Sequence, residues 1–243
     1  SLAGDFEKAL DYVQRSMEAN SLNLKARSLE AGLLRRLGRP DEARRIAAGA
    51  RSLDPLDLWS ANELYLIDSK AGDRAASEQS LGRVAALLRD SDANALELAT
   101  DYANCGMWPE AIAVLERETV RRPKASPLLD YALGYYRAQS GHADAALKAL
   151  KTAVSKPPDN IFPFEVEFME ILGWAEKQNP DDGRAPYYLG NLLFDGQPEL
   201  AIAAWERSRS RDASLAVVHR NLGLAYARVR DRKSVEERKS VHN

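Results

Sequence analysis

The chain has 243 residues, of which 45% are hydrophobic and 29% charged, and its formal net charge is −2. This near-neutral balance excludes a general electrostatic attraction to nucleic acid or to an anionic membrane. No apolar run reaches the roughly 20 residues of a membrane span, and the single cysteine, Cys105, excludes an internal disulfide framework. We therefore expect no nucleic-acid partner and no membrane insertion. The expected location is cytoplasmic, unless a targeting signal lies outside this sequence.

Five evenly spaced glycines organise the first two thirds of the chain. Their spacings are 34, 34, 34 and 35 residues, at Gly4, Gly38, Gly72, Gly106 and Gly141. A small residue stands five positions after each glycine, namely Ala9, Ala43, Ser77, Ala111 and Ala146. A proline follows three of these glycines after 17 positions, as Pro55, Pro123 and Pro158. A ladder of this period predicts a chain of repeated structural units.

Each unit in residues 1–158 has the apolar pattern of two amphipathic helices. In one of them, Leu98 and Tyr102 precede the glycine at helical spacing, and Ala111 and Leu115 follow it. The glycine suits a left-handed end of the first helix, and the proline cannot continue the second. The small residue lets the two helices approach closely. We predict half a unit followed by four helix pairs, each of which buries its apolar face against its neighbours.

Residues 159–182 interrupt the repeat, because they are too few for another helix pair. The pattern predicts an irregular break near 156–163 and then a single helix over 164–177. We expect Phe162 and Phe164 to plug the break, with a partner site as the alternative. The inner face of the single helix is predicted to consist of Phe168, Ile171, Leu172 and Ala175.

The repeat resumes over residues 183–230. Leu189–Gly190 belongs to a first helix, and Ala201 and Trp205 belong to the second. A lone glycine without a preceding strand is weak evidence for a ligand loop, so we interpret Gly190 as a close helix contact. Residues 231–243 carry charge where an apolar helix face belongs, which predicts a polar tail that is frayed or disordered.

These units resemble the tetratricopeptide repeat (TPR), whose period is about 34 residues. The best match is the unit that contains Leu133–Gly134, Gly141, Ala146, Leu150, Ala153 and Pro158. The resemblance implies an all-α fold, a right-handed superhelical solenoid of antiparallel helix pairs. The stretch from Asn179 to Tyr226 also resembles the C-terminal repeats of bacterial proteins whose N-terminal domain, of β-sandwich and sugar-handling character, has no known function. The chain, which opens inside a repeat, is then expected to be a segment of a longer protein.

In TPR proteins the first helix of each pair lines a concave groove, and the resemblance assigns groove positions here. The main set is Trp59, Asn62, Lys70, Asn104, Tyr131, Tyr135, Gln139, Arg184, Tyr187, Asn191 and Arg220. Further positions are Arg35, Arg36, Thr100 and Arg228. Tyrosine offers contact area and arginine pairs with carboxylate, so this set suits an extended peptide or an acidic segment. The alternative is a polar groove that no ligand occupies.

The clamp that some TPR proteins use for a C-terminal carboxylate is incomplete in this chain. Asn191 and Asn221 fit its asparagine positions, but Tyr187 stands where a lysine is expected. We therefore expect no binding of chaperone tails. The two asparagines are expected to hydrogen-bond between neighbouring helices instead.

Residues with catalytic or metal-binding chemistry do not form any familiar motif. His142, His219 and His242 are far apart in the sequence, and no base is evident near Cys105. We therefore expect no enzyme activity, no metal site and no cofactor. The basic end of the chain offers only Tyr226 for stacking on a base, so we interpret that end as solvated.

The expected function is a non-catalytic scaffold for protein–protein interaction, whose groove binds a peptide or a partner protein. One such partner is the missing N-terminal domain of the same protein, which would cover Phe6, Leu10 and Val13 of the first unit. The alternative is an accessory helical segment of a larger carbohydrate-acting enzyme whose catalytic domain is absent from this sequence.

Overall fold

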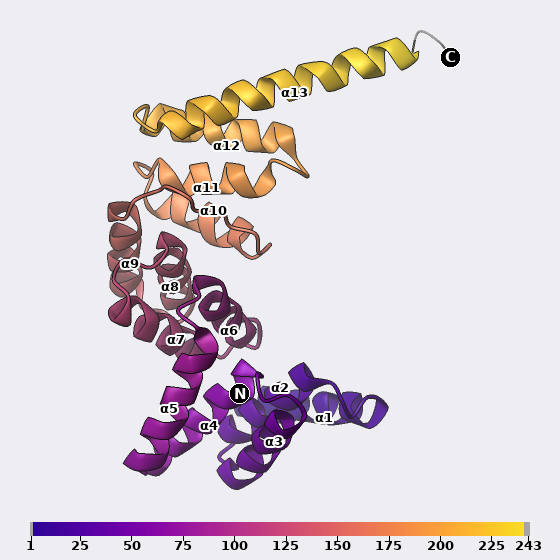
Figure 1. The fold of residues 1–243 in the computed structure, drawn as a ribbon, viewed down its shortest axis with the longest axis vertical. Helices are drawn as coiled ribbons and strands as arrows, with labels where there is room; N and C mark the ends of the chain where they lie inside the picture. The colour runs from indigo at the N-terminus through magenta and orange to yellow at the C-terminus, as the bar shows by residue number, and fades with distance from the viewer. Residues whose placement is uncertain (1, 241–243) are drawn as a thin grey trace. The chain divides into compact units, whose positions relative to one another are not determined.

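The computed structural model describes the backbone of residues 2–240 and the side chains of residues 5–228. All regular secondary structure in that part is α-helical (Figure 1), as the all-α prediction requires. None of the described helices combines the length and the apolar character that crossing a membrane requires. The helices are α1 (Leu2–Ala19), α2 (Leu24–Arg36), α3 (Pro40–Leu53), α4 (Leu58–Ala71), α5 (Arg74–Leu88), α6 (Asp92–Asn104), α7 (Trp108–Arg121), α8 (Pro127–Gln139), α9 (Ala143–Ser155), α10 (Phe168–Gln178), α11 (Arg184–Leu193), α12 (Pro198–Arg211) and α13 (Ala216–Ser240).

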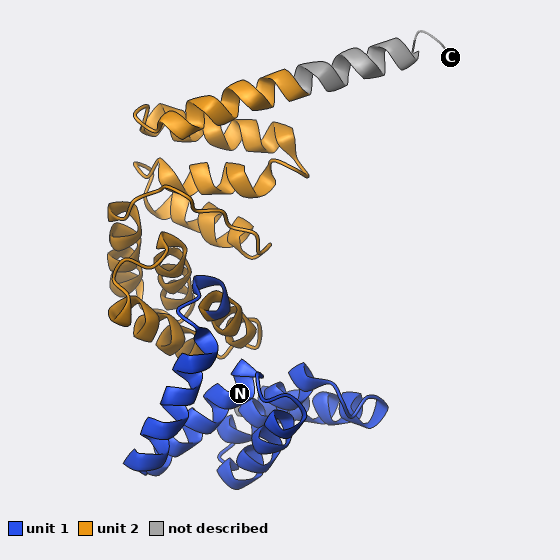
Figure 2. Ribbon diagram, viewed as in Figure 1, with its two compact units in different colours: residues 1–94 blue, residues 95–243 orange. Residues whose placement is uncertain are grey.

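The chain divides into two compact units, residues 1–94 and 95–243 (Figure 2). Their boundary falls inside the segment 1–158, which the repeat pattern treats as one array. The segments 159–182 and 183–230 both lie in the second unit. The division drawn from the repeats therefore stays a prediction, and each compact unit contains buried hydrophobic residues.

Four of the five glycine bends are confirmed. Gly38, Gly72, Gly106 and Gly141 have positive φ values of 78°, 75°, 69° and 85°. A residue with Cβ is strained in this left-handed conformation, which explains why glycine ends these helices. The prediction for Gly4 is wrong, because this residue lies inside α1.

The bend between α5 and α6 is built without glycine. Arg89 and Asp90 both adopt left-handed φ values, of 54° and 55°. Arg89 stands 17 residues after Gly72, at the position where three other units carry proline. Asn94 satisfies the end of α5, because its Nδ2 donates to the carbonyl oxygens of Leu87 and Leu88 at 3.4 and 3.3 Å. A side-chain amide therefore satisfies the end of the helix at this bend, where three other units carry proline.

Small residues allow close packing in the first unit. Ala31 of α2 and Ala47 of α3 are fully buried and form one cluster with Leu64 of α4. Ala43, which follows its ladder glycine by five positions, is also fully buried. The predicted role of the small residue is thus confirmed at this bend.

Helix α1 packs on α2 and covers part of its own apolar face. Leu10 is only 3% exposed, so the expectation that it is left partly uncovered is wrong. Phe6 and Val13 are half-buried, as expected. The guanidinium of Arg36 lies 5.4 Å from the centre of the Phe6 ring, which gives that ring a cation–π neighbour.

Asp57 joins the start of α4 to α2. Its Oδ2 accepts a hydrogen bond from the backbone N–H of Ser60 at 3.2 Å, which caps α4. The same oxygen accepts from the hydroxyl of Ser28 at 2.8 Å. Ser28 is fully buried, so its hydroxyl needs a partner inside the protein. One carboxylate therefore satisfies a helix end and a buried hydroxyl.

Replacing Asp57 with alanine is expected to lower the free energy of unfolding of the first unit by about 1–2 kcal/mol, because both bonds are lost. Asp73→Ala is the matched control, since Asp73 caps α5 through the N–H of Ala76 at 3.0 Å but is exposed. The control should lose no more than about 1 kcal/mol. Urea denaturation followed by circular dichroism measures both changes. Equal losses would show that the contact with Ser28 contributes nothing.

In the second unit, α8 and α9 approach most closely at a glycine. A Cβ on Gly134 would lie 3.2 Å from the carbonyl oxygen of Ala146 and 3.3 Å from Leu150 Cδ2. Both of these residues are buried, so they have little room to move away. Gly134 therefore sets the spacing of this helix pair, at the unit that matches the TPR pattern best.

The predicted irregular break is confirmed, although its helix begins later than expected. α9 ends at Ser155, and α10 begins at Phe168 rather than near residue 164. The connection contains Pro157, Pro158 and Pro163, and proline disfavours helix both at its own position and at the one before it. The predicted inner face is confirmed, because Phe168, Ile171, Leu172 and Ala175 are all buried.

A buried ion pair anchors the start of this connection. Lys156 Nζ lies 2.5 Å from Asp130 Oδ2 of α8 and also donates to the carbonyl oxygen of Ala125 at 3.0 Å. Asp130 is 3% exposed and Lys156 is 8% exposed. Removal from water raises the pKa of the Asp130 carboxyl, and the nearby ammonium of Lys156 opposes that rise. The pair ties the end of α9 to the start of α8.

Phe162 and Phe164 do not plug the break. They are 65% and 70% exposed, so that prediction is wrong. The interior between α8 and α11 is already filled by Tyr131 and Tyr188, whose rings meet edge to face with their centres 6.0 Å apart. The hydroxyl of Tyr131 donates to Asp182 Oδ2 at 2.6 Å.

Gly190 is confirmed as a contact between α11 and α12. A Cβ there would overlap the indole of Trp205, whose Cε2 would be 2.8 Å away. Trp205 is 2% exposed, and its Nε1 donates to the carbonyl oxygen of Tyr187 and to Asn191 Oδ1, both at 3.2 Å. Packing and hydrogen bonds thus fix this ring in one position.

Helix α13 packs on α12 and runs to Ser240. Val218, Leu222 and Ala225 are buried on its inner face. The predicted polar tail over 231–243 falls outside the side chains that the structure describes, and its last three residues lie outside the described backbone as well.

Candidate functional site

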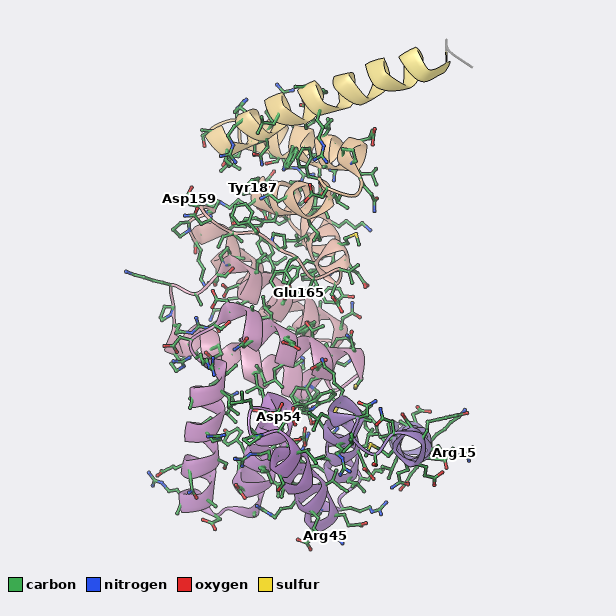
Figure 3. All side chains as sticks on the ribbon, turned by 45° about the vertical axis from the view of Figure 1, so that its right-hand side comes forward. Arg15, Arg45, Asp54, Asp159, Glu165 and Tyr187 are labelled. Atoms are coloured by element: carbon green, nitrogen blue, oxygen red, sulfur yellow. The ribbon has the colours of Figure 1, made fainter. Side chains whose placement is uncertain are left out.

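The residues predicted to line a groove fall into a buried set and an accessible set. The accessible or half-buried set is Lys70, Asn104, Gln139, Arg184, Asn191 and Arg220. The buried set, with exposed fractions between 0% and 9%, is Trp59, Asn62, Tyr131, Tyr135 and Tyr187. Figure 3 shows Tyr187 among the helices of the second unit. The predicted groove position of this buried set is therefore wrong, because these side chains present almost no surface to a ligand.

The single helix α10 explains part of this difference. It packs directly on α8, the first helix of its pair, and covers part of that helix. Tyr135 of α8 donates to Glu170 Oε1 of α10 at 2.5 Å and meets the Trp174 ring with centres 5.6 Å apart. Burial and the neighbouring carboxylate raise the pKa of Tyr135 to about 12. Its hydroxyl is therefore committed to a helix contact.

Arg184 also has a structural contact. Its Nη1 donates to the carbonyl oxygens of Val154 and Lys156 at the C-terminal end of α9. A cation there satisfies carbonyl groups that the helix itself leaves without partners. Arg184 therefore holds α11 against α9.

A small surface in the second unit combines exposed apolar groups with polar ones; we call it the Phe162 surface. It borders a cavity of about 230 Å³ lined by Phe162, Asn191, Phe194, Trp205, Arg220, Asn221 and Leu224. Phe162 is 65% and Leu224 60% exposed. The sequence indicated a partner site at Phe162 only as the alternative to a plug, and it gave no indication for Leu224. The sequence feature that indicates an exposed contact here is Phe162, which lies between prolines and outside the helical pattern, where no packing partner is expected.

The polar part of the Phe162 surface is a chain of side-chain hydrogen bonds. Asn221 Nδ2 of α13 donates to Asn191 Oδ1 of α11 at 3.1 Å, which confirms the predicted bond between the two asparagines. Trp205 Nε1 donates to the same oxygen at 3.2 Å. Two donors therefore fix the orientation of the Asn191 amide. Its Nδ2 is shielded from solvent and has no hydrogen-bond acceptor among the described residues.

Two arginines supply positive charge beside this surface. Arg220 is exposed and donates to Asn221 Oδ1 from Nε and Nη2 at 3.3 and 3.0 Å. No carboxylate pairs with it in the part of the chain that is described. Arg228 lies over the Phe194 ring at 5.1 Å and reaches Asp195 at 3.5 Å. The cation that remains available to a ligand is Arg220.

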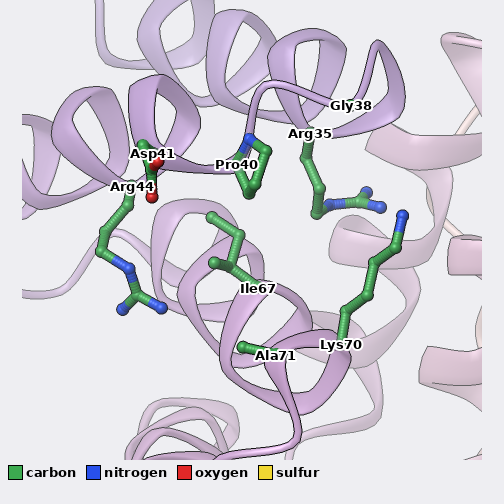
Figure 4. A pocket seen from close by; sticks show the side chains of 8 residues that line it. All are labelled: Arg35, Gly38, Pro40, Asp41, Arg44, Ile67, Lys70 and Ala71. Atoms are coloured by element: carbon green, nitrogen blue, oxygen red, sulfur yellow. The ribbon is translucent and has the colours of Figure 1, made fainter.

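A second cavity, of about 390 Å³, lies in the first unit between α2, α3 and α4 (Figure 4). Figure 4 shows Ile67 and Pro40 between two charged sides, with Arg35 and Lys70 on one and Arg44 and Asp41 on the other. Both arginines already have carboxylates beneath them, at 2.6 Å from Glu63 and 2.5 Å from Asp68. Of the predicted groove residues, only Lys70 offers this cavity a cation that is not in an ion pair with a described residue.

The described residues show little chemistry of the kind that catalysis needs. No group of three or more histidine, cysteine, aspartate or glutamate side chains among them could hold a metal ion. Burial raises the pKa of the Cys105 thiol to about 11, so the thiolate is scarce at neutral pH.

No family model and no curated protein matches the chain. Solved structures do, and three are representative. MamA is 20% identical, and the match covers 63% of this chain and 88% of MamA with a TM-score of 0.36. YrrB, described as a TPR protein with an unusual peptide-binding site, is 13% identical over 86% of this chain and 96% of its own, with a TM-score of 0.33.

A third similar structure is TTC0263, a thermophilic TPR protein of Thermus thermophilus. It is 18% identical, and the match covers 81% of this chain and 95% of its own with a TM-score of 0.30. This chain is therefore similar to TPR proteins, as the repeat pattern predicts. TM-scores of this size carry no argument about function, and the peptide-binding site belongs to YrrB.

Proposed function

We propose that this chain is a non-catalytic scaffold for protein–protein interaction, and that the Phe162 surface binds a short segment of a partner protein. The observation that carries the proposal is the pairing of exposed Phe162 and Leu224 around one cavity with Arg220, an exposed cation that forms no ion pair with a described residue.

The apolar contacts give the segment its anchor. Phe162 comes from the irregular connection, and Leu224 comes from α13, so an inserted side chain would meet apolar groups from two elements. A cavity of about 230 Å³ lies below the range of roughly 300–1,000 Å³ that is typical of sites for small-molecule ligands. A cavity of this size accommodates one or two side chains. Binding would recover the free energy lost by leaving two large apolar groups in water.

The polar contacts give the segment its direction. Asn191 Nδ2 is shielded from solvent, so the polar contact for the segment is not this amide nitrogen. Arg220 is an accessible guanidinium that can pair with a carboxylate through two parallel bonds. We therefore infer that the preferred segment carries an apolar side chain close to an aspartate, a glutamate or a C-terminal carboxylate. No observation on the described residues favours the carbohydrate-acting alternative.

Selection from a displayed peptide library by the purified chain would test this proposal. The selected peptides should carry an apolar residue near an acidic one, and fluorescence anisotropy would give their dissociation constants. In the variant Phe162→Ala/Leu224→Ala the affinity should fall at least about tenfold, because both apolar anchors are lost. Both residues are exposed, so the fold should remain intact by circular dichroism.

The control variant is Phe164→Ala/Val166→Ala, which removes two apolar side chains that are 70% and 62% exposed but do not line the cavity. Its affinity should stay within about twofold of the original. Peptides that bind both variants and the original chain equally would contradict the assignment of this surface. Peptides that lack an acidic group would contradict the role given to Arg220.

A further inference from the structure

A cavity of about 550 Å³ in the first unit brings three arginines together; we call it the arginine cleft. The cleft is lined by Arg44, Arg51, Leu64, Asp68, Ala76, Gln79, Ser80 and Arg83. Helical spacing explains the arrangement. The two lining residues of α3 are seven positions apart, and the two of α4 are four positions apart. The four lining residues of α5 follow one another at intervals of one to three positions, so each helix contributes side chains from one of its faces. Both α3 and α5 pack on α4, whose residues form the floor.

The charges in the cleft are not balanced. It contains three arginines and one aspartate, which gives a net formal charge of +2. Asp68 is already fully engaged, because Oδ1 lies 2.5 Å from Arg44 Nη2 and Oδ2 accepts from the Ser80 hydroxyl at 2.7 Å. The two other arginines therefore receive no negative charge from it.

Arg51 and Arg83 are half-buried and form no ion pair with any residue that the structure describes. The Nε atoms of both are shielded from solvent and lack an acceptor there. Arg83 does donate from Nη2 to the carbonyl oxygen of Pro55 at 2.7 Å, which fixes one end of its guanidinium. Because these Nε atoms are shielded, an incoming anion would pair with the terminal nitrogens of Arg51, which form no hydrogen bond with a described residue.

We propose that the arginine cleft binds the carboxylates of an acidic segment of a partner protein. Guanidinium groups pair with carboxylates through two parallel hydrogen bonds, and Leu64 and Ala76 place apolar groups in the lining beside them. The cleft is wider than one small anion needs. Gln79 and the side chains of Leu64 and Ala76 provide contacts for the backbone and methylene groups of a peptide. This site lies entirely in the first unit and does not depend on the function proposed for the Phe162 surface.

Fluorescence anisotropy with a labelled hexaglutamate amide would test the proposal on the full chain, at about 150 mM salt so that long-range attraction is screened. A labelled hexaglutamine amide is the uncharged control peptide. The chain should bind hexaglutamate and not hexaglutamine. In Arg51→Gln/Arg83→Gln the affinity for hexaglutamate should fall at least about tenfold, because the two unpaired cations are removed.

The matched control is Arg45→Gln/Arg74→Gln, which removes the same charge from exposed positions of the first unit that do not line the cleft. Arg45 lies at the surface in Figure 3. This variant should bind hexaglutamate within about twofold of the original. Equal losses in the two variants would overturn the proposal, since they would show a delocalised charge effect. Absence of binding by the original chain would overturn it too.

A free anion is the other source of the same chemistry, and inorganic sulfate is the probe for it. Sulfate should compete with hexaglutamate for the original chain, and Arg51→Gln/Arg83→Gln should weaken the binding of both anions. That result would support the cleft as the site of the peptide carboxylates. Sulfate binding that depends on Arg51 and Arg83, with no binding of hexaglutamate, would overturn the protein partner and assign the cleft to a free anion.

Discussion

Replacing Lys156 with methionine is expected to lower the free energy of unfolding of the second unit by about 3–5 kcal/mol at neutral pH. The variant keeps a similar side-chain volume but leaves Asp130, which is 3% exposed, without its cation. A buried carboxylate without a partner is unfavourable because the interior cannot replace its hydration. The tie between the end of α9 and the start of α8 is lost as well. Tryptophan fluorescence during urea denaturation follows this transition.

The loss of stability in Lys156→Met should depend on pH, and the ionisation of the Asp130 carboxyl sets the direction of that dependence. Burial raises the pKa of this carboxyl in the folded chain, so the folded state holds the proton more tightly than the unfolded state. The group therefore stabilises the fold fully below its unfolded pKa of about 3.9, and this contribution is lost as the pH rises through the folded pKa. Without Lys156 the pKa rises further, so the deficit of the variant should grow between about pH 4 and pH 7.

Lys148→Met is the matched control for Lys156→Met. Lys148 lies on α9 and is exposed, so its replacement should change the free energy of unfolding by less than about 0.5 kcal/mol at any pH. A deficit in Lys156→Met that is equally large at pH 4 and pH 7 would show that the loss comes from packing and not from the charge of Asp130.

Replacing Gly190 with alanine, the smallest change possible there, is expected to destabilise the second unit by about 1–3 kcal/mol. The added Cβ would overlap the Trp205 indole, which is 2% exposed and held by two hydrogen bonds. The ring cannot move away without breaking its bond to Asn191 Oδ1. The same urea experiment measures the change.

Gly223→Ala provides the control, because Gly223 also follows a leucine in a first helix but has nothing within 4 Å of an added Cβ. Alanine is the better helix former, so this variant should gain about 0.4–1 kcal/mol. If Gly190→Ala is as stable as Gly223→Ala, then α11 and α12 have room to separate, and the close contact does not limit stability.

The sequence predicted those features that recur with the repeat. A glycine every 34 residues indicated the bends, and the small residue five positions later indicated close helix contacts such as Ala43. Both depend on local backbone geometry, which a single sequence displays directly. The bond between Asn191 and Asn221 was also predictable, because equivalent positions on successive first helices lie side by side.

Other features arise where the repeat is interrupted, and there the sequence was a poor guide. The predicted groove positions assume an open face on each first helix, but Tyr135 packs against α10 and Tyr131 packs against Tyr188 of α11. The repeat period does not predict the ion pair between Asp130 and Lys156. The arginine cleft depends on which cations lack a carboxylate, and this follows only from the distances between side chains.

The division of the chain into two compact units has a consequence for how this protein can change. Substitutions that share no contacting residue have nearly additive effects, so changes at two sites with no lining residue in common can accumulate separately. The Phe162 surface and the arginine cleft belong to different units. Selection can therefore alter either proposed surface without changing a residue that lines the other.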